Sequence, residues 1–391
     1  MKFGMQFFPC VGPETKSAEQ YFNECLSLVG DADDLGYDHV RIVEHYFHSY
    51  GGYSPNPMLF LAAAAQRTRK ARLVTGAILP VFNNPLKLAG EIGMLDAISS
   101  GRLDVGFARA FMPHEFARFG ISMDESKGRF TEGIEQIRGL LEEEKFSSKG
   151  EFHEFPPTTS YPRPTQRPRP PFYIAAFATP QSFEEAGKSG HAIMAIPLSG
   201  GKMSELIGLY RDAWKSAGHQ GNGKVMLAFH MFCWPNETEA IDHSRSRINN
   251  YLNTLVKAGS DWLEEESSDY PGYRKLIMDL AEETFETQLE KGAAWVGTPS
   301  QIYEQITSYR DQVGDFDIAS LQVNFYDMPL GLAKKSIDLF SKKSCLNYRR
   351  ILILIRLSLM TCFTEGYQTP VIIGQWRYEA YTKHYWNDPP G

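Results

Sequence analysis

The chain has 391 residues, with 40 Lys plus Arg and 47 Asp plus Glu, so its formal net charge is −7 at pH 7. This length can bury a large core, either as one α/β barrel or as two ordinary domains. The acidic balance argues against nucleic acid or an anionic membrane as the main partner, and a small molecule is the expected ligand.

Short runs rich in Val, Ile and Phe alternate along the chain with segments of helical period. The sequence predicts eight strands, which are KFGMQFF from residue 2, HVRIVE from 39, ARLVTGAILPV from 71, RLDVGFARA from 102, PFYIAAFA from 171, HAIMAIP from 191, KVMLAFHMFCW from 224 and ASLQVNF from 319. Helices are predicted at residues 17–36, 56–68, 85–99, 128–144, 203–218 and 332–340, and from Gln181.

This alternation predicts βαβ units and a parallel sheet, because each parallel pair of strands needs a crossover. Eight strands favour a closed (β/α)₈ TIM barrel of the α/β class. The alternative is an open doubly wound sheet, which would carry a glycine fingerprint in its first βα turn. That turn reads FFPCVGPET and contains no GxGxxG.

Three segments depart from the alternation. Residues 146–170 are rich in proline and are predicted to form an excursion rather than a regular element. Residues 236–293 are too long for one crossover helix, so we expect an inserted helical hairpin there that can act as a lid. Residues 344–391 differ in style from the body, and Arg356 interrupts their apolar run. The predicted domains are a barrel at 1–343 and a C-terminal extension at 344–391.

The N-terminus and the cysteines indicate a cytoplasmic protein. The first fifteen residues lack the longer apolar region and small-residue cleavage site of a secretory signal. The five cysteines are widely spaced and include no CxxC pair, so neither a disulfide framework nor a metal site is expected.

Candidate functional residues follow the predicted strands, where the functional side chains of a barrel gather. His45 ends the second strand beside Glu44, in the aromatic stretch EHYFHSYGGYSPNP. The alternative for His45 is a loop histidine that the backbone satisfies. The segment HEFAR at His114 lacks the second His of a zinc-protease helix, and no GxSxG elbow is present.

Two arginines and one turn suit an anion. Arg109 ends the fourth strand, and its guanidinium offers a planar fork of donors to a phosphate; an ordinary ion pair is the alternative. Arg129 lies near the start of the next helix, where free N–H groups attract anions, and a solvated surface arginine is the alternative. The fifth strand runs into AAFATPQS, which supplies small residues, a threonine and another helix start. Together these features indicate a phosphate-bearing cofactor.

The residues from Met1 to about Lys343 resemble the bacterial luciferase-like family of flavin-dependent monooxygenases, which are (β/α)₈ barrels. The matching segments are EHYF, SPNPMLFLAAAAQRT, TGAILPVFNNPLKLAGEIGMLDAISSGRLDVGFARAF, PRPPFYIAAFATPQS, WVGTPSQI and AKKSIDLF. The linked block from Leu79 to Arg109 is the most diagnostic of them.

The resemblance implies roles for individual residues. It makes His45 the active-site histidine beside the flavin ring. It implies cofactor-binding roles for Arg109 and Arg129 on the flavin phosphate, for Ala176, Phe177 and Thr179 in the strand-five turn, and for Gly76 and Ala77 at a non-proline cis peptide expected near Thr75 to Ala77. The family's light-emitting luciferases carry a cysteine where this chain has Ala108, and a Glu where it has Ala176, so light emission is not expected.

The resemblance also implies an activity. Reduced FMN, delivered by a separate NAD(P)H-dependent flavin reductase, would react with O₂ at the flavin C4a carbon to give a hydroperoxide that oxygenates a small, mainly apolar substrate. His45 would be its acid/base or hydrogen-bond donor. A homodimer is implied by family habit.

Three alternatives stay open at this point. The first is a deazaflavin-dependent dehydrogenase on the same fold, which would transfer hydride without oxygen. The second is a flavin-binding homologue without turnover. The third sets the resemblance aside and is a barrel aldolase or sugar-phosphate isomerase, for which the sequence offers no convincing Lys at a strand end.

Overall fold

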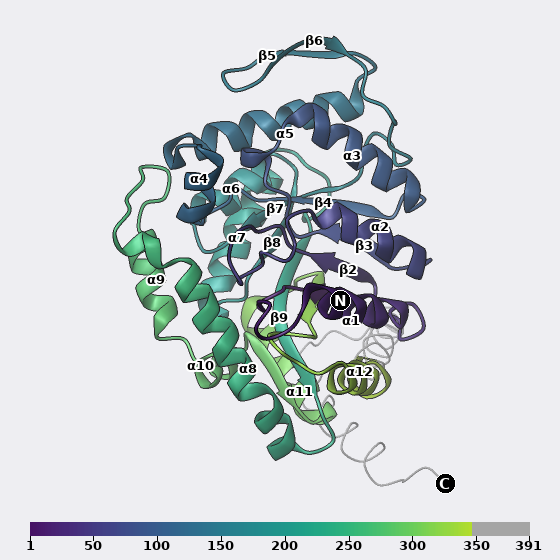
Figure 1. Cartoon of the computed structure of the whole chain (residues 1–391), viewed down its shortest axis with the longest axis vertical. Helices are drawn as coiled ribbons and strands as arrows, with labels where there is room; N and C mark the ends of the chain where they lie inside the picture. The colour runs from purple at the N-terminus through teal and green to yellow at the C-terminus, as the bar shows by residue number, and fades with distance from the viewer. Residues whose placement is uncertain (346–391) are drawn as a thin grey trace, which may run out of the picture. The chain divides into compact units, whose positions relative to one another are not determined.

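The computed structural model describes residues 1–345, and eight parallel strands within them close into a barrel surrounded by helices (Figure 1). The barrel strands, in the order in which they pair, are β1 (Lys2–Phe7), β2 (His39–Ile42), β3 (Arg72–Thr75), β4 (Leu103–Phe107), β7 (Phe172–Ala176), β8 (Ala192–Ala195), β9 (Val225–Cys233) and β11 (Ile318–Gln322). Strand β11 pairs with β1, which closes the ring. The predicted (β/α)₈ barrel is confirmed.

The α-helices of the described residues alternate with these strands. They are α1 (Ala18–Gly30), α2 (Pro57–Arg67), α3 (Pro85–Ile98), α4 (Pro113–Phe119), α5 (Ser126–Glu142), α6 (Pro180–Lys188), α7 (Gly200–Ser216), α8 (Glu237–Ala258), α9 (Tyr273–Ala281), α10 (Phe285–Glu290), α11 (Pro299–Val313) and α12 (Leu330–Leu339). The shorter helical turns are η1 (Pro80–Phe82), η2 (Met123–Glu125), η3 (Ser260–Leu263) and η4 (Phe340–Cys345). No helix within residues 1–345 has the length and apolarity that crossing a bilayer requires.

Local sequence explains where several helices begin. Asn56 and Asn84 accept hydrogen bonds from backbone N–H groups in the first turns of α2 and α3. Each is followed by a proline at the first helical position, where no donor is lost. Helix α1 ends at Gly30, not at Gly36 as predicted. In the segment that follows, Asp33 accepts the backbone N–H groups of Lys70 and Ala71, which ties this segment to the residues just before β3.

Four other predictions need correction. The proline-rich excursion contains an antiparallel ribbon, β5 (Phe146–Lys149) and β6 (Glu154–Thr158). Strand β10 (Ala294–Gly297) was not predicted, and it pairs with the end of β9 outside the ring. Helix α4 was also missed, because its seven residues are too few to show a period. The insertion is helical as predicted, but it holds α8, α9 and α10 rather than a hairpin.

The centre of the barrel is packed with side chains from strands on opposite sides of the ring. Val74, Tyr173, Met194, Met226 and Ile318 form one buried cluster. Burial of each large apolar side chain stabilises the fold by ~1.5–3 kcal/mol. This core fills the middle of the barrel, and a cavity lies beyond it at the carboxyl ends of the strands.

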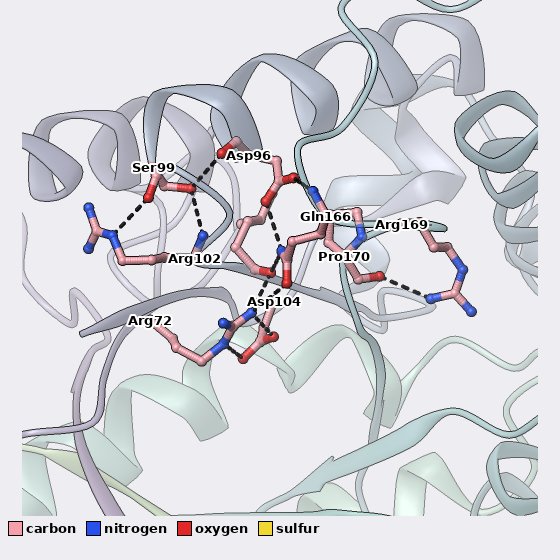
Figure 2. A network of polar contacts seen from close by, with 9 residues as sticks. Arg72, Asp96, Ser99, Arg102, Asp104, Gln166, Arg169 and Pro170 are labelled. Carbon is pink, nitrogen blue, oxygen red and sulfur yellow. Dashed lines mark hydrogen bonds and ion pairs between the residues drawn. The ribbon is translucent and has the colours of Figure 1, made fainter. Parts of the chain in front are cut away.

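A polar network closes the other end of the barrel (Figure 2). Arg72, the first residue of β3, donates to both carboxylate oxygens of Asp104 in β4, at 2.8 and 2.7 Å. Gln166 of the excursion accepts from Arg72 at 3.1 Å and donates to Asp96 of α3 at 2.8 Å. The excursion is thereby fixed to the amino ends of two strands.

The insertion packs against the opposite rim. Trp262, Tyr270 and Ile277 form a buried cluster with Leu79 and Phe116 of the barrel loops. The Trp262 indole donates to the carbonyl of Phe111 at 2.7 Å. The insertion therefore covers the carboxyl ends of the strands. Residues 346–391, nearly all of the predicted extension, lie outside the described residues, so the boundary at 343 stays a prediction.

Candidate active site

A cavity of about 410 Å³ lies at the carboxyl ends of the barrel strands. Its inner wall comes from the strands and their loops, and its outer wall comes from the insertion. The insertion contributes apolar side chains of α8 and α9, namely Tyr251, Leu252, Leu255, Tyr273, Leu276 and Leu280. A largely apolar pocket in this place is where a barrel enzyme binds its small molecules.

Nearly all residues predicted for the site line this one cavity. They are His45, Gly76, Ala77, Arg109, Ala176, Phe177 and Thr179. The peptide bond between Gly76 and Ala77 is cis, as expected at that turn. The loops after β2, β3, β4 and β7 thus bring together residues that lie far apart in the sequence.

Arg129 does not line the cavity. Its Nε donates to Glu125 at 2.8 Å, and its guanidinium lies 4.6 Å from the centre of the Phe152 ring. The start of α5, which was expected to attract an anion, already holds one. The carboxylate of Asp269 accepts from Ser126 Oγ at 3.1 Å and from the backbone N–H of Lys127 at 2.8 Å.

Arg109 lies on the cavity wall beside the loop that carries this aspartate. Its Nη2 donates to the carbonyl of Asp269 at 2.8 Å, and its guanidinium lies 4.3 Å from the centre of the Tyr270 ring. Tyr270 in turn donates to the carbonyl of Ala110 at 2.8 Å. The Tyr273 hydroxyl is a further hydrogen-bond partner of Arg109. No carboxylate of residues 1–345 forms an ion pair with Arg109, so its guanidinium is available to an anionic ligand.

His45 is held by a carboxylate. Its Nδ1 lies 3.0 Å from Oε1 of Glu115 in α4, and the same oxygen accepts the backbone N–H of Tyr46 at 2.8 Å. Both side chains are buried. Since one ring nitrogen faces Glu115, the other, Nε2, is the one left for the cavity. The backbone-bonded alternative for His45 does not match this geometry.

A glycine is needed at position 51 of the same loop for steric reasons. Gly51 has φ 82°, and a Cβ at this position would lie 2.5 Å from Cβ of His45. Only a glycine both adopts this backbone readily and leaves room for the imidazole. The ring is further enclosed by Phe8, Tyr50 and Phe111, whose centres lie 5.3–6.1 Å away.

Sequence reasoning missed Glu115 because its segment was tested only for a second zinc ligand. Its partner His45 stands 70 residues earlier, and no local spacing connects the two. The sequence offered no signal for this pair beyond an acidic residue near a rim.

Glu44 is a second buried carboxyl beside His45 in the sequence, and unlike Glu115 it lines the cavity. It accepts hydrogen bonds from the Tyr46 hydroxyl, the Asn83 amide and the backbone N–H of Leu79. Burial raises the pKa of Glu44 to about 7, and these three hydrogen bonds oppose the rise. A carboxyl of this kind can exchange a proton near neutral pH.

Arg41 lies on the cavity floor, and sequence reasoning treated it as an ordinary strand residue. It is 7% exposed and donates to Gln6 Oε1 at 2.8 Å and to the Gly76 carbonyl at 3.1 Å. Burial lowers the pKa of its guanidinium to about 10, so the group stays charged at neutral pH.

These residues fit a flavin. The apolar walls suit a flat ring, and the buried polar atoms of the floor suit its hydrogen-bonding edge. Arg109 and the strand-five turn would hold its phosphate, and the N-cap Thr179 leaves the first turn of α6 without a side-chain hydrogen bond. The fit rests on the kinds of groups present and on their burial.

Comparisons with known proteins agree with this fit. The chain matches the luciferase-like monooxygenase family over residues 1–315. The oxygenase component of flavin-dependent trigonelline monooxygenase from Acinetobacter baylyi is 32% identical over 274 residues, which are 69% of this chain and 73% of that protein. The crystal structure of the monooxygenase RslO1 from Streptomyces bottropensis has a TM-score of 0.80 at 43% identity, covering 89% of this chain and 100% of that one.

One relative of different chemistry is also similar. The F420-dependent glucose-6-phosphate dehydrogenase of Amycolatopsis mediterranei is 29% identical over 212 residues, which are 52% of this chain and 61% of that protein. The family match, by contrast, spans the barrel from its first strand to the residues just before its last. On that match and the similarity to the trigonelline enzyme, the chain belongs to the luciferase-like monooxygenase family.

Proposed function

We propose that this chain is the oxygenase component of a two-component, FMN-dependent monooxygenase. It would use reduced FMN and O₂, through the C4a-hydroperoxide expected above, to oxygenate a small and mainly apolar substrate. The observation that carries the proposal is His45, held by buried Glu115 in the wall of an apolar cavity at the strand ends.

Bound FMN would supply the electrons that activate O₂. The chain would hold the cofactor in place and exclude water from the site. Arg109 and the turn at Ala176, Phe177 and Thr179 would hold the phosphate, because a cation and free N–H groups attract it. The loop after β3, with Gly76 and Ala77, would contact the ring. Leucines of α8 and α9 would keep water away from the reacting atoms.

His45 would hold or move the proton. Its Nδ1–H donates to the Glu115 carboxylate, which fixes the orientation of the ring and leaves Nε2 toward the cavity. Neutral imidazole accepts a proton at Nε2, and the protonated ring donates one there. A positioned acid/base of this kind contributes ~10²–10⁴-fold to a rate.

A separate NAD(P)H-dependent reductase is the proposed transient partner. The trigonelline relative is named as an oxygenase component, which supports a division of labour between two proteins. A homodimer is part of the same proposal.

The F420-dependent relative favours one second candidate, a deazaflavin-dependent dehydrogenase in the same cavity. Its cofactor would need the same flat apolar site. Anaerobic titration of the purified chain with FMN and with F420 separates the two candidates. Tighter binding of F420 than of FMN would favour the dehydrogenase and count against the monooxygenase.

The direct test mixes the reduced FMN complex with O₂ in a stopped-flow spectrometer. We expect reoxidation in two phases, with the second phase slow because the cavity is dry. The slow phase is the decay of the oxygenated flavin to oxidised FMN. His45→Ala should accelerate this decay by about tenfold or more, because no imidazole then holds the proton in place.

The matched control is His48→Ala. His48 accepts the backbone N–H of Tyr50 within the same loop but does not line the cavity, so its loss perturbs the loop without removing a cavity group. Its reoxidation should stay within about twofold of the wild-type rate. If wild-type protein reoxidises in a single phase, as free flavin does, the monooxygenase proposal is contradicted. The chain would then be a flavin-binding homologue without turnover.

A further inference from the structure

Arg41 is a buried cation that no carboxylate of residues 1–345 pairs with. Its described acceptors, the Gln6 amide oxygen and the Gly76 carbonyl, are both neutral. Each of its terminal nitrogens makes one hydrogen bond there, so each keeps a second N–H. Burying an unpaired charge is costly, and a charge kept in such a place is usually balanced by a partner.

Arg41 belongs to a row of polar side chains that crosses four neighbouring strands. Arg41 of β2 is in register with Gln6 of β1, Gln6 with Gln322 of β11, and Gln322 with His230 of β9. All four are buried, with relative exposures of 8% or less. We call Gln6, Arg41, Gln322 and His230 the floor row.

The floor row has more hydrogen-bonding capacity than the described residues use. Nε of Arg41, Nε2 of Gln322 and Nε2 of His230 are all buried without a partner within residues 1–345. Burial lowers the pKa of His230 to about 4, so its ring is neutral at neutral pH. The row therefore presents one positive charge and several neutral polar groups, and no carboxylate of residues 1–345 forms an ion pair with that charge.

The space around Arg41 is adapted to the guanidinium. A Cβ at Gly76 would lie 2.0 Å from Nε of Arg41, so the glycine leaves the room that the group occupies. Phe8, Val43, Tyr50 and Tyr251 line the cavity beside it and give an apolar surrounding in which charge interactions are strong. Only Gln322 of the floor row does not reach the cavity wall.

We propose that the floor row is an anion-recognition site, and that it binds the edge of a planar organic group whose negative charge is shared between neighbouring atoms. Arg41, at one end of the row, supplies the countercharge, and Gln6 and His230, which lie further along the row, supply hydrogen bonds. Two sources have this chemistry. One is the ring of reduced FMN in its anionic form, which rests on the proposed function; the other is a carboxylate or phenolate of an aromatic substrate.

The experiment measures two preferences in the wild-type chain, in Arg41→Met and in Arg41→Lys. The first is the ratio of dissociation constants for oxidised and reduced FMN under anaerobic conditions, with the reduction potential of bound FMN as a second readout. The second is the ratio for benzamide and benzoate, a neutral and an anionic probe of similar shape. The control is Arg72→Met, which removes a partly buried guanidinium at the far end of the barrel.

We expect Arg41→Met to reduce one preference by about thirtyfold or more, the usual effect of removing one partner of a buried charge pair. Arg41→Lys should keep part of it, because the charge remains while the planar fork is lost. Arg72→Met should change neither ratio. Loss of the FMN preference with a lowered potential identifies the flavin as the source, and loss of the benzoate preference alone identifies the substrate.

Other outcomes overturn the proposal. If wild-type protein prefers neither reduced FMN nor benzoate, or if Arg41→Met keeps both preferences, Arg41 serves only to hold Gln6 and Gly76. If circular dichroism shows that Arg41→Met does not fold, the wild-type ratios and Arg41→Lys decide in the same way. Failure of either FMN form to bind would contradict the proposed function, while the benzoate arm would still test the floor row.

Discussion

At the scale of single residues, the site depends on two buried carboxyl groups that have different roles. Glu115 orients His45, and Glu44 holds Tyr46, Asn83 and the backbone of Leu79 together. Burial raises the pKa of Glu44 to about 7. The pH dependence of stability therefore offers a test of its environment.

Because its pKa is raised in the folded state, Glu44 should make the free energy of unfolding fall as pH rises. Between the unfolded pKa of about 4.5 and the folded pKa of about 7, the native state keeps a proton that the unfolded state has released. The stability that Glu44 contributes is thus present below about pH 4.5 and is lost as pH rises through 7. In Glu44→Gln this loss is absent.

Urea unfolding of both proteins from pH 5 to 8 checks this. The free energy of unfolding of Glu44→Gln minus that of wild type should rise through the window, by on the order of 3 kcal/mol at most, and level off above about pH 8. The difference is needed because burial lowers the pKa values of His39, His191 and His230, which act with the opposite sign at acidic pH. A flat difference would contradict the raised pKa.

At the scale of elements, the loop after β2 and the inserted segment shape the cavity. The loop turns at Gly51 against His45, and its backbone N–H at Gly51 donates to the carbonyl of Pro9. The insertion brings Asp269 to the start of α5, where it supplies the anion that helix dipoles favour. This is why α5, although it carries Arg129, contributes no free anion site.

Substitution of Gly51 separates backbone strain from loss of the site. Gly51→Ala should lower the free energy of unfolding by more than the ~1–2 kcal/mol of an ordinary left-handed alanine, because its Cβ also collides with His45. Gly218→Ala is the control, since Gly218 has φ 80° and nothing within 4 Å of the added Cβ.

The readouts are chemical denaturation and the reoxidation trace of bound reduced FMN. In Gly51→Ala the slow phase of reoxidation should be accelerated, as in His45→Ala. Gly218→Ala should lose stability but keep the wild-type rate of this phase. If both alanine variants reoxidise FMN like wild type, the contact between Gly51 and His45 does not position the imidazole.

At the scale of the whole barrel, one end carries the ligand cavity and the other end carries a network that stabilises the fold. The carboxyl ends of the strands carry the cavity, and the amino ends carry the network of Arg72, Asp104 and Gln166 (Figure 2). Residues at the amino ends of barrel strands generally serve stability rather than chemistry. Part of the segment that most resembles the family, around Asp96 and Asp104, lies in this structural network.

Removal of Arg72 should therefore destabilise the barrel without weakening its ligand site. Arg72→Met leaves the Asp104 carboxylate buried with no ion-pair partner among the described residues, and we expect a loss of about 2 kcal/mol because Arg72 itself is one-third exposed. Thermal or urea unfolding measures the loss, and FMN titration should give an unchanged dissociation constant.

The surface pair of Lys87 and Glu91 in α3 provides the comparison. It is an exposed i,i+4 pair, so Lys87→Met should cost no more than about 0.5 kcal/mol. An Arg72→Met variant as stable as Lys87→Met, or one that binds FMN more weakly than wild type, would contradict this division between the ends of the barrel.

The sequence by itself determined the alternation of elements, and hence the barrel. Apolar runs and helical periods are local properties, so the eight strands and most helices could be predicted directly. The motif EHYF and the strand-end position of Arg109 likewise marked residues that line the cavity. Short elements such as α4 and β10 were missed because few residues carry little periodicity.

Tertiary structure decided which side chains meet. Glu115 approaches His45 across 70 residues, Asp269 reaches the start of α5 across 142, and the floor row exists only because four strands share a register. Arg129 looked like a phosphate ligand in the linear sequence, yet Glu125 and Phe152 hold it outside the cavity. Such contacts depend on closure of the barrel, a global property that no local pattern of residues encodes.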